Sequence, residues 1–140
     1  GEEEEPRNPA SILKTIGEEV GATADCDKCN FTVLFNDGGR QDIVQAARKL
    51  AAACLAGPIK PDDLTVEGFK SYLWTAGLPD VDLLVRTSGE LRVSNCYLYQ
   101  IAYAEMEFPK TYWPDYSAEE LKTALAEFKA RDRRLGAIKE

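Results

Sequence analysis

The sequence predicts an α/β fold in which helices flank a small parallel sheet. Two runs rich in β-branched, aromatic or aliphatic residues, FTVLF at 31–35 and VDLLV at 81–85, are typical of strands. A polar turn and then helical periodicity follow each run, and strands that alternate with helices favour a parallel sheet. EMEF at 105–108 is a candidate third strand. A sheet of two or three strands leaves open edges, so we expect the chain to be part of a larger fold.

Two helices are expected in the first half of the chain. Pro9 suits a first helical position, and apolar residues follow it at helical intervals, at Ile12, Leu13, Ile16 and Val20. The turn NDGGR at 36–40 precedes the strongest apolar stripe of the sequence, which ends at GPIKP, 57–61. Its apolar and small positions are Ile43, Val44, Ala47, Leu50, Ala51, Cys54 and Leu55.

Three more helices are expected in the second half, each beginning at a capping residue. Thr65 opens a weaker helix, Ser94 with Asn95 opens another, and Ser117 with Glu120 has the spacing of a capping box. Their helical positions are, in the same order, Phe69, Tyr72 and Leu73; Leu98, Ile101 and Ala102; and Leu121, Ala124, Leu125 and Phe128.

Length and composition predict one domain with a single core, because the 140 residues are 44% hydrophobic. We expect residues 1–10, which hold four of the 24 acidic residues, to be an acidic leader or an expression remnant, and 11–140 to be the folded segment. No apolar run is long enough to span a membrane and no secretory signal pattern opens the chain, so a cytoplasmic location is expected. The net charge of −7 argues against nucleic acid as a partner.

The cysteines leave two interpretations open. Cys26 and Cys29 form a single C-x-x-C pair, Cys54 and Cys96 lie far from it, and the chain has no histidine. Structural zinc sites usually need a second pair or histidines, so we favour free thiols in a reducing cytosol over zinc.

Both polar turns are expected at the carboxyl ends of strands, where ligands bind in open α/β sheets. In the second turn, RTSGELRVSN at 86–95, Arg86 and Arg92 offer donors to phosphate oxygens, and Ser94 with the expected helix terminus adds more. The alternative is a surface loop whose arginines pair with Glu90 and other acids. In the first turn, Gly38, Gly39 and Arg40 either serve the geometry of the turn or contact phosphate.

Glu105 follows the expected apolar stripe of the helix after Ser94, seven residues beyond Leu98. A carboxylate there must be paired, protonated or metal-bound, and Mg²⁺ is the simplest explanation near a diphosphate. The alternative is a solvent-exposed helix end. Arg131, Arg133 and Arg134 are expected to be cations that suit the C-terminal end of the last helix.

Several motifs together resemble the C-terminal half of the cis-prenyltransferases, the undecaprenyl and dehydrodolichyl diphosphate synthase family. They are DLLVRTSGELRVSN, LYQIAYAEMEF, WPDY, RDRRLG and, earlier, NDGGRQDIVQAARKL. The resemblance runs from about residue 11 to the end of the chain, and the block at 86–95 is the most specific part of it. It implies the C-terminal portion of the family's α/β fold.

The resemblance also implies an activity, the condensation of isopentenyl diphosphate with an allylic diphosphate such as farnesyl diphosphate to a Z-polyprenyl diphosphate. Arg86, Arg92 and Ser94 match the residues that hold isopentenyl diphosphate, and Glu105 matches the acid linked to the Mg²⁺ cofactor. Arg134 and Gly136 match a tail motif that completes the neighbouring site in a dimer. Isoprenoid biosynthesis, of undecaprenyl or dolichol precursors, would be the setting.

One departure from the family bears directly on activity. The family's first-strand motif Asp-Gly-Asn-Gly-Arg, which handles the allylic diphosphate, does not occur in this sequence. We therefore expect part of a prenyltransferase that acts as a homodimer or heterodimer, with the N-terminal half cleaved, disordered or on a separate chain. We expect it in the cytoplasm, either free or at a membrane surface such as that of the endoplasmic reticulum. The alternative is a non-catalytic partner subunit or a diphosphate-binding fragment without turnover of its own.

Overall fold

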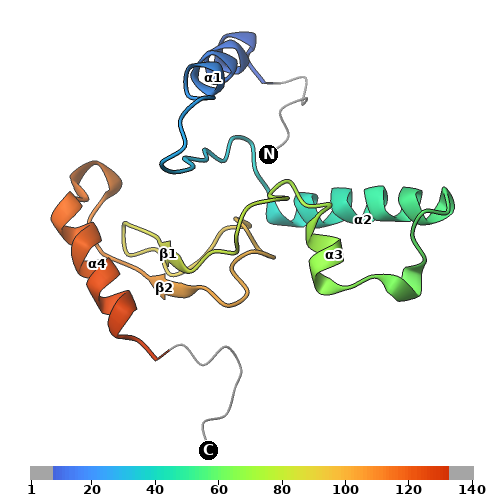
Figure 1. Ribbon diagram of the computed structural model, residues 1–140. Helices are drawn as coiled ribbons and strands as arrows, with labels where there is room; N and C mark the ends of the chain where they lie inside the picture. Colours follow the sequence, from blue (N-terminus) through green and yellow to red (C-terminus); the bar gives the residue numbers. More distant parts are fainter. Residues whose placement is uncertain (1–7, 133–140) are drawn as a thin grey trace, which may run out of the picture.

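The computed structural model describes residues 8–132 of the chain, and Figure 1 shows their arrangement. The helices are α1 (Ala10–Ala22), α2 (Gly39–Leu55), α3 (Val66–Lys70) and α4 (Ala118–Ala130), and the strands are β1 (Leu83–Val85) and β2 (Glu105–Glu107). Two 3₁₀ turns, Pro61–Asp63 and Trp113–Asp115, precede α3 and α4. Helices and a parallel sheet are both present, so the predicted α/β class is confirmed.

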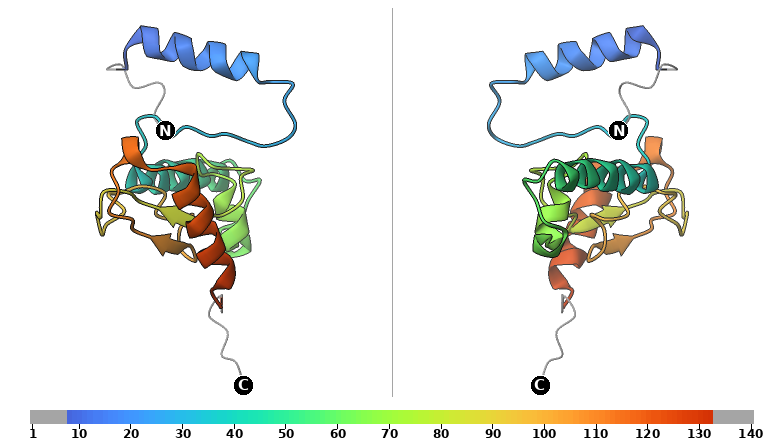
Figure 2. Two further views of the ribbon diagram at one scale, coloured as in Figure 1. Left: turned by 90° about the vertical axis from the view of Figure 1, so that its left-hand side faces the viewer. Right: turned by 90° about the vertical axis from the view of Figure 1, so that its right-hand side faces the viewer.

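The sheet consists of β1 and β2, which pair in parallel with Leu83 opposite Glu105 and Val85 opposite Glu107. The pairing continues past β1, because the Arg86 N–H donates to the Glu107 carbonyl at 2.9 Å. Figures 1 and 2 show the sheet between α4 on one side and the α2–α3 pair on the other. The carboxyl ends of both strands therefore meet at one edge, where the second polar turn begins.

A buried polar network joins α2 to the segment that follows α3. The Asp42 side chain is 4% exposed, and its Oδ1 accepts hydrogen bonds from Gln45 Nε2 at 2.9 Å and from the Trp74 N–H at 2.8 Å. Its Oδ2 accepts from Gln100 Nε2 at 3.2 Å, and Gln100 also donates to Thr75 Oγ1 at 2.7 Å. Because these groups are buried and paired, they fix the position of α2 against the segment before β1 and the segment between β1 and β2.

The hydrophobic core is small for a chain of this length. The buried apolar residues of the described part are Ala46, Leu73, Ile101 and Ala124. Helix α1 buries none of its residues and stands apart from the other elements in Figures 1 and 2. Large apolar side chains remain exposed on several elements, among them Leu55, Leu91, Tyr112 and Trp113. The expectation that the chain is part of a larger fold agrees with this distribution.

The predicted strand at 31–35 is wrong for this structure. The segment carries no regular secondary structure, and Phe31 and Val33 are 90% and 69% exposed. A strand exists only where a neighbour accepts its hydrogen bonds, and the sheet of the described residues is limited to β1 and β2.

The predicted helix after Ser94 is also wrong. Residues 94–103 form a series of turns, in which Ser94, Asn95 and Tyr97 have φ values of 48°, 63° and 50°. These left-handed conformations are incompatible with a right-handed α-helix. The expected dipole at a helix start near Ser94 is therefore absent from the described structure.

The remaining helix predictions are confirmed. The Thr65 side chain accepts from the Gly68 N–H at 3.0 Å at the start of α3, although α3 ends at Lys70, before Tyr72 and Leu73. Ser117 and Glu120 form both bonds of the capping box at the start of α4. These caps depend on residues three positions apart, so the sequence alone identifies them.

Candidate functional site

The two polar turns meet at Asn95. Its carbonyl accepts a hydrogen bond from the Gly39 N–H at 2.6 Å, and its Oδ1 accepts from the Arg40 N–H at 2.9 Å. Its Nδ2 donates to Gln41 Oε1 at 3.0 Å. The start of α2 is thus attached to the end of the 86–95 turn, which brings together the two segments that the sequence places at strand ends.

Arg86 and Ser94 come together within the second turn. Arg86 follows β1 directly, and its Nη1 donates to Ser94 Oγ at 2.9 Å. Ser94 accepts that bond on its oxygen, so its own hydroxyl proton can still be donated elsewhere. A guanidinium and a hydroxyl side by side form a donor pair for an anion.

Arg92 lies in the same turn but pairs with an acid. Its Nη1 contacts Glu90 Oε2, and the side chains are 63% and 39% exposed. An exposed pair of this kind contributes only about 0–1 kcal/mol. An anion with two or more charges can therefore compete with Glu90 for Arg92.

Backbone bonds hold the tip of this turn against the segment after β2. The Ser88 N–H donates to the Thr111 carbonyl and the Gly89 N–H to the Pro109 carbonyl, both at 2.8 Å. Gly89 has a φ of 65°, where a side chain would be strained. The amides of Ser88 and Gly89 thus serve the fold and are not free to bind a ligand.

Gly38 and Gly39 allow the close approach of the two turns. A Cβ at Gly39 would lie 2.8 Å from the Leu98 backbone nitrogen, and one at Gly38 would lie 3.1 Å from Asn95 Nδ2. The structure therefore gives both glycines a packing role. Their predicted contact with phosphate stays a prediction.

Arg40 lines a shallow hollow on the exposed face of α2. The hollow has a volume of about 340 Å³ and is also lined by Gln41, Val44, Gln45 and Arg48. Because its backbone N–H is bonded to Asn95, Arg40 would reach a phosphate through its guanidinium.

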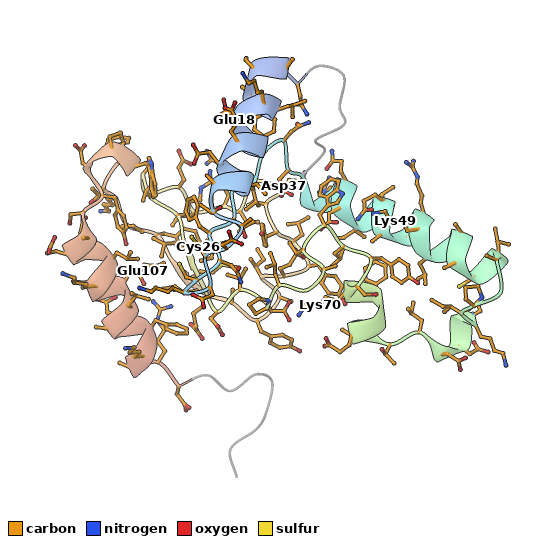
Figure 3. The ribbon with its side chains drawn as sticks, turned by 45° about the horizontal axis from the view of Figure 1, so that its top comes forward. Glu18, Cys26, Asp37, Lys49, Lys70 and Glu107 are labelled. Carbon is orange, nitrogen blue, oxygen red and sulfur yellow. The ribbon has the colours of Figure 1, made fainter. Side chains whose placement is uncertain are left out.

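Glu105 is the first residue of β2, so the prediction that it ends a helical stripe is wrong. Its Oε2 accepts from Arg131 Nη1 at 3.2 Å, while Arg131 Nη2 contacts Glu107 Oε2 at 2.6 Å. Arg131 Nη1 also donates to the Met106 carbonyl at 3.1 Å. Figure 3 shows Glu107 beside α4, the helix that Arg131 follows. From the sequence, Arg131 is predicted only as a terminal cation, and this bridge to β2 is missed.

The donors around Glu105 fit Mg²⁺ only as part of a shared site. Within residues 8–132 no group of three or more carboxylates or thiols could hold a metal ion. Mg²⁺ is commonly bound through one or two carboxylates together with substrate phosphates and water. Glu105 can supply one such carboxylate, provided that a diphosphate supplies further oxygens.

Two ionisable groups near the start of α2 and the second turn have raised pKa values. Burial raises the pKa of Asp37, and the nearby Asp42 carboxylate raises it further; Figure 3 shows Asp37 beside the start of α2. Burial also raises the pKa of the Cys96 thiol, with Asp37 adding to the effect and Arg86 opposing it. The Cys96 thiol therefore stays protonated near pH 7 and adds no negative charge of its own beside Arg86.

Cys26, Cys29, Cys54 and Cys96 form no disulfide bonds. The choice between free thiols and zinc at Cys26 and Cys29 stays a prediction. Cys26 and Cys29 are exposed, in the loop after α1. Arg133, Arg134 and Gly136 lie outside the described residues, so the prediction for the tail stays a prediction.

The motifs of both turns belong to a known family, because the prenyltransferase family model for undecaprenyl diphosphate synthase matches residues 4–136. The chain belongs to the undecaprenyl diphosphate synthase family. The resemblance to cis-prenyltransferases is thereby confirmed. Within the family, the chain is 41% identical over 128 residues to an isoprenyl transferase of Geobacter sulfurreducens, covering 91% of this chain and 52% of the relative. It is 46% identical over 127 residues to an isoprenyl transferase of Caulobacter vibrioides, covering 91% and 49%.

The family fold is confirmed by a solved structure. Lavandulyl diphosphate synthase from Lavandula x intermedia, crystallised in complex with dimethylallyl diphosphate, superposes with a TM-score of 0.86 at 36% identity. The match covers 91% of this chain and 55% of that protein. The chain thus spans about half the length of the relatives it matches, as expected for a partial family fold. In the part that the structure describes, none of the helices could cross a membrane.

Proposed function

We propose that this chain supplies the isopentenyl-diphosphate site of a cis-prenyltransferase that joins isopentenyl diphosphate to an allylic diphosphate such as farnesyl diphosphate. The contact between Arg86 and Ser94 carries the proposal, because it places two donors of the RTSGELRVSN block together at the end of β1. The membership of the chain in a prenyltransferase family supports the reaction class.

Arg86, Arg92 and Ser94 would act as a clamp on the diphosphate. Arg86 and Ser94 are already in contact, so little reorganisation is needed before they donate to the phosphate oxygens. Arg92 exchanges its exposed Glu90 partner for the diphosphate. Arg40 adds a guanidinium from the first turn, and Gly38 and Gly39 let that turn approach the second.

Binding the diphosphate in a fixed position is the contribution of these residues to the chemistry. The condensation needs the isopentenyl double bond held against the allylic carbon, and a clamped diphosphate fixes the other end of the small substrate. Fixed cationic donors also stabilise negative charge without reorganising during the reaction.

Glu105 is the residue we assign to the Mg²⁺ cofactor. When bound, Mg²⁺ would neutralise diphosphate charge and help to orient it. Glu105 is held by Arg131, so Arg131 sets the position from which this carboxylate meets a metal.

The partner in this proposal supplies the rest of the family fold. The small core, the exposed apolar segment at 31–35 and the half-length match to relatives all support a missing complementary part. That part would be a separate N-terminal half, in a homodimeric or heterodimeric assembly in which Arg134 and Gly136 complete a neighbouring site. The assembly would act in the cytoplasm or at a membrane surface, on undecaprenyl or dolichol precursors.

Isothermal calorimetry with isopentenyl diphosphate and Mg²⁺ on the full chain tests the binding site. Arg92→Ala should weaken binding by about 1.5–3 kcal/mol, the range for a hydrogen bond to a charged group. Lys49→Ala, on α2 and outside the motif blocks at 86–95, is a control for the loss of one positive charge. Equal affinities of wild type, Arg92→Ala and Lys49→Ala would remove Arg92 from the site.

Two carboxylate variants test the metal assignment. Glu105→Gln should remove the Mg²⁺ dependence of binding, whereas Glu107→Gln, which also loses a contact with Arg131, should keep it. A Mg²⁺ dependence that survives in Glu105→Gln would refute the role of Glu105.

An assay with farnesyl diphosphate and labelled isopentenyl diphosphate separates the two functions left open. Product formed by this chain alone would make it an enzyme in its own right. Product formed only with a second chain, identified by native mass measurement, would make it one part of a split enzyme. Binding without product in either case supports the alternative, a non-catalytic partner or diphosphate-binding fragment.

A further inference from the structure

We propose that Asn95 is a positioning residue, which holds the second polar turn on the start of α2 and thereby directs Ser94 and Arg86 toward the diphosphate. The inference rests on the proposed function of the turn. It assigns to Asn95 no contact with the substrate.

Asn95 caps a helix that is distant in sequence. The N-cap residue of α2, Gly38, has no side chain to provide a cap, so α2 begins without a local one. Asn95 replaces it from 55 residues away, since its Oδ1 accepts from the Arg40 N–H and its carbonyl accepts from the Gly39 N–H. Two of the N–H groups that an α-helix leaves unpaired at its start are satisfied in this way.

The same bonds decide how α2 takes part in the site. A free helix start would offer its N–H groups to an anion. Here Gly39 and Arg40 give theirs to Asn95, at 2.6 and 2.9 Å. The helix start therefore fixes the turn, and the turn presents its side chains to the ligand.

The backbone of the turn needs this support. Ser94 and Asn95 both have left-handed φ values, 48° and 63°, which cost energy for residues other than glycine. Asparagine tolerates the conformation better than serine does, and its bonds to α2 offset the cost at both positions. Ser94 Oγ faces Arg86 only while this backbone is kept.

The fit between the turns leaves little room for another arrangement. Asn95 Nδ2 donates to Gln41 Oε1, and both groups crowd the position that a Cβ on Gly38 would occupy. A shift of Asn95 would therefore break its bonds to α2 and move Ser94, its neighbour in the chain.

Asn95→Gly is the variant that tests this role, because glycine accepts the left-handed backbone while the side-chain bonds are lost. We expect the affinity of the full chain for isopentenyl diphosphate to fall about tenfold, as is typical when a residue that supports a ligand-binding group is removed. Thr65→Gly is the matched control, since it removes the cap of α3, which lies outside both turns. It should lower stability and leave the affinity unchanged.

A double-mutant cycle distinguishes positioning from general destabilisation. If Asn95 acts through Ser94, adding Asn95→Gly to Ser94→Ala should weaken binding by much less than tenfold. A tenfold loss in both backgrounds, or no loss in either, would overturn the inference. Gln41→Ala removes only the hydrogen bond from Asn95 Nδ2. It should lower the affinity about two- to threefold, less than Asn95→Gly does. An unchanged affinity for Gln41→Ala would also count against the inference if Asn95→Gly failed to fold.

The Arg86→Ala variant keeps this inference separate from the proposed function. If Arg86→Ala binds isopentenyl diphosphate like the wild type, the diphosphate site itself is wrong and the role of Asn95 falls with it. If Arg86→Ala loses affinity while Asn95→Gly does not, the site stands and only the positioning role is refuted.

Discussion

Replacing Arg131 with glutamine should destabilise the chain more than the loss of any exposed ion pair. Arg131 joins Glu105, Glu107 and the Met106 carbonyl, at 3.2, 2.6 and 3.1 Å. Glu105 and Glu107 are two residues apart in β2, so their carboxylates lie on the same face of the sheet. They repel one another once the guanidinium between them is removed. The substitution therefore removes two ion pairs and leaves two like charges together.

The size of the effect follows from the exposure of the three side chains. The side chains of Arg131, Glu105 and Glu107 are 30%, 31% and 23% exposed, so the bridge is neither fully exposed nor fully buried. Exposed ion pairs contribute about 0–1 kcal/mol, and breaking a buried pair costs about 3–5 kcal/mol. We expect the free energy of unfolding to fall by about 2–3 kcal/mol. Adding Glu107→Gln to Arg131→Gln should restore part of the loss, because it removes the repulsion.

Urea unfolding followed by circular dichroism measures this change. Lys122→Gln is the matched control, since Lys122 pairs with Glu119 on α4 and both side chains are more than 70% exposed; its cost should be under about 0.5 kcal/mol. The bridge would have no stabilising role if Arg131→Gln cost no more than this control. The reasoning about repulsion would be refuted if Glu107→Gln gave no recovery.

Three further predictions concern charge and burial. Glu90→Gln should raise the affinity for isopentenyl diphosphate a few fold in calorimetry, since it releases Arg92; an unchanged affinity would mean that Glu90 does not compete. Hydrogen bonds at the start of α4, above all the one from the Ser117 N–H, hold the pKa of the Glu120 carboxyl below its ordinary value of 4.5. The ionised carboxylate therefore stabilises the fold above pH 4.5, and this contribution is lost as the pH falls through the lowered pKa. Urea unfolding should accordingly show the advantage of wild type over Glu120→Gln constant near pH 7 and shrinking in acid; an advantage that does not change with pH would contradict this. Asp42→Ala should cost at least about 3 kcal/mol in urea unfolding, because several buried donors lose their acceptor; a cost under about 1 kcal/mol would show that water replaces the carboxylate.

The elements that the sequence predicts correctly are those with local causes. Helices α3 and α4 begin at caps made by residues three positions apart, and α2 has an unbroken apolar stripe. The segment 31–35 has strand composition but needs a neighbouring strand, which the described sheet does not provide. Ser94 and Asn95 are good capping residues, yet Asn95 caps α2 and leaves the segment after it in turns. Their partners lie far away in the sequence, so local patterns could not identify them.

The candidate site also contains features that local sequence patterns predict and features that depend on distant contacts. Only the second polar turn follows a strand, β1, because the segment before the first turn has no regular structure; the contacts of Asn95 nevertheless bring the two turns together. The bridge from Arg131 to Glu105 depends on how α4 packs against β2, across 26 residues of sequence. A pattern of nearby residues contains no information on such a contact, although a cation directly after a well-capped helix was a weak signal.

The two interpretations of the second turn predict different partners for its arginines. In a surface loop, each arginine would pair with an acid, and this is what Arg92 does with Glu90. Arg86 instead donates to the neutral hydroxyl of Ser94. It also lies near the Cys96 thiol, whose pKa is raised by burial, so that the thiol stays protonated. These contacts orient the guanidinium without cancelling its charge, which is what an anion site requires. Arg86 is therefore the better first target for mutagenesis, and Arg92 would strengthen the proposed site to the extent that a diphosphate displaces Glu90.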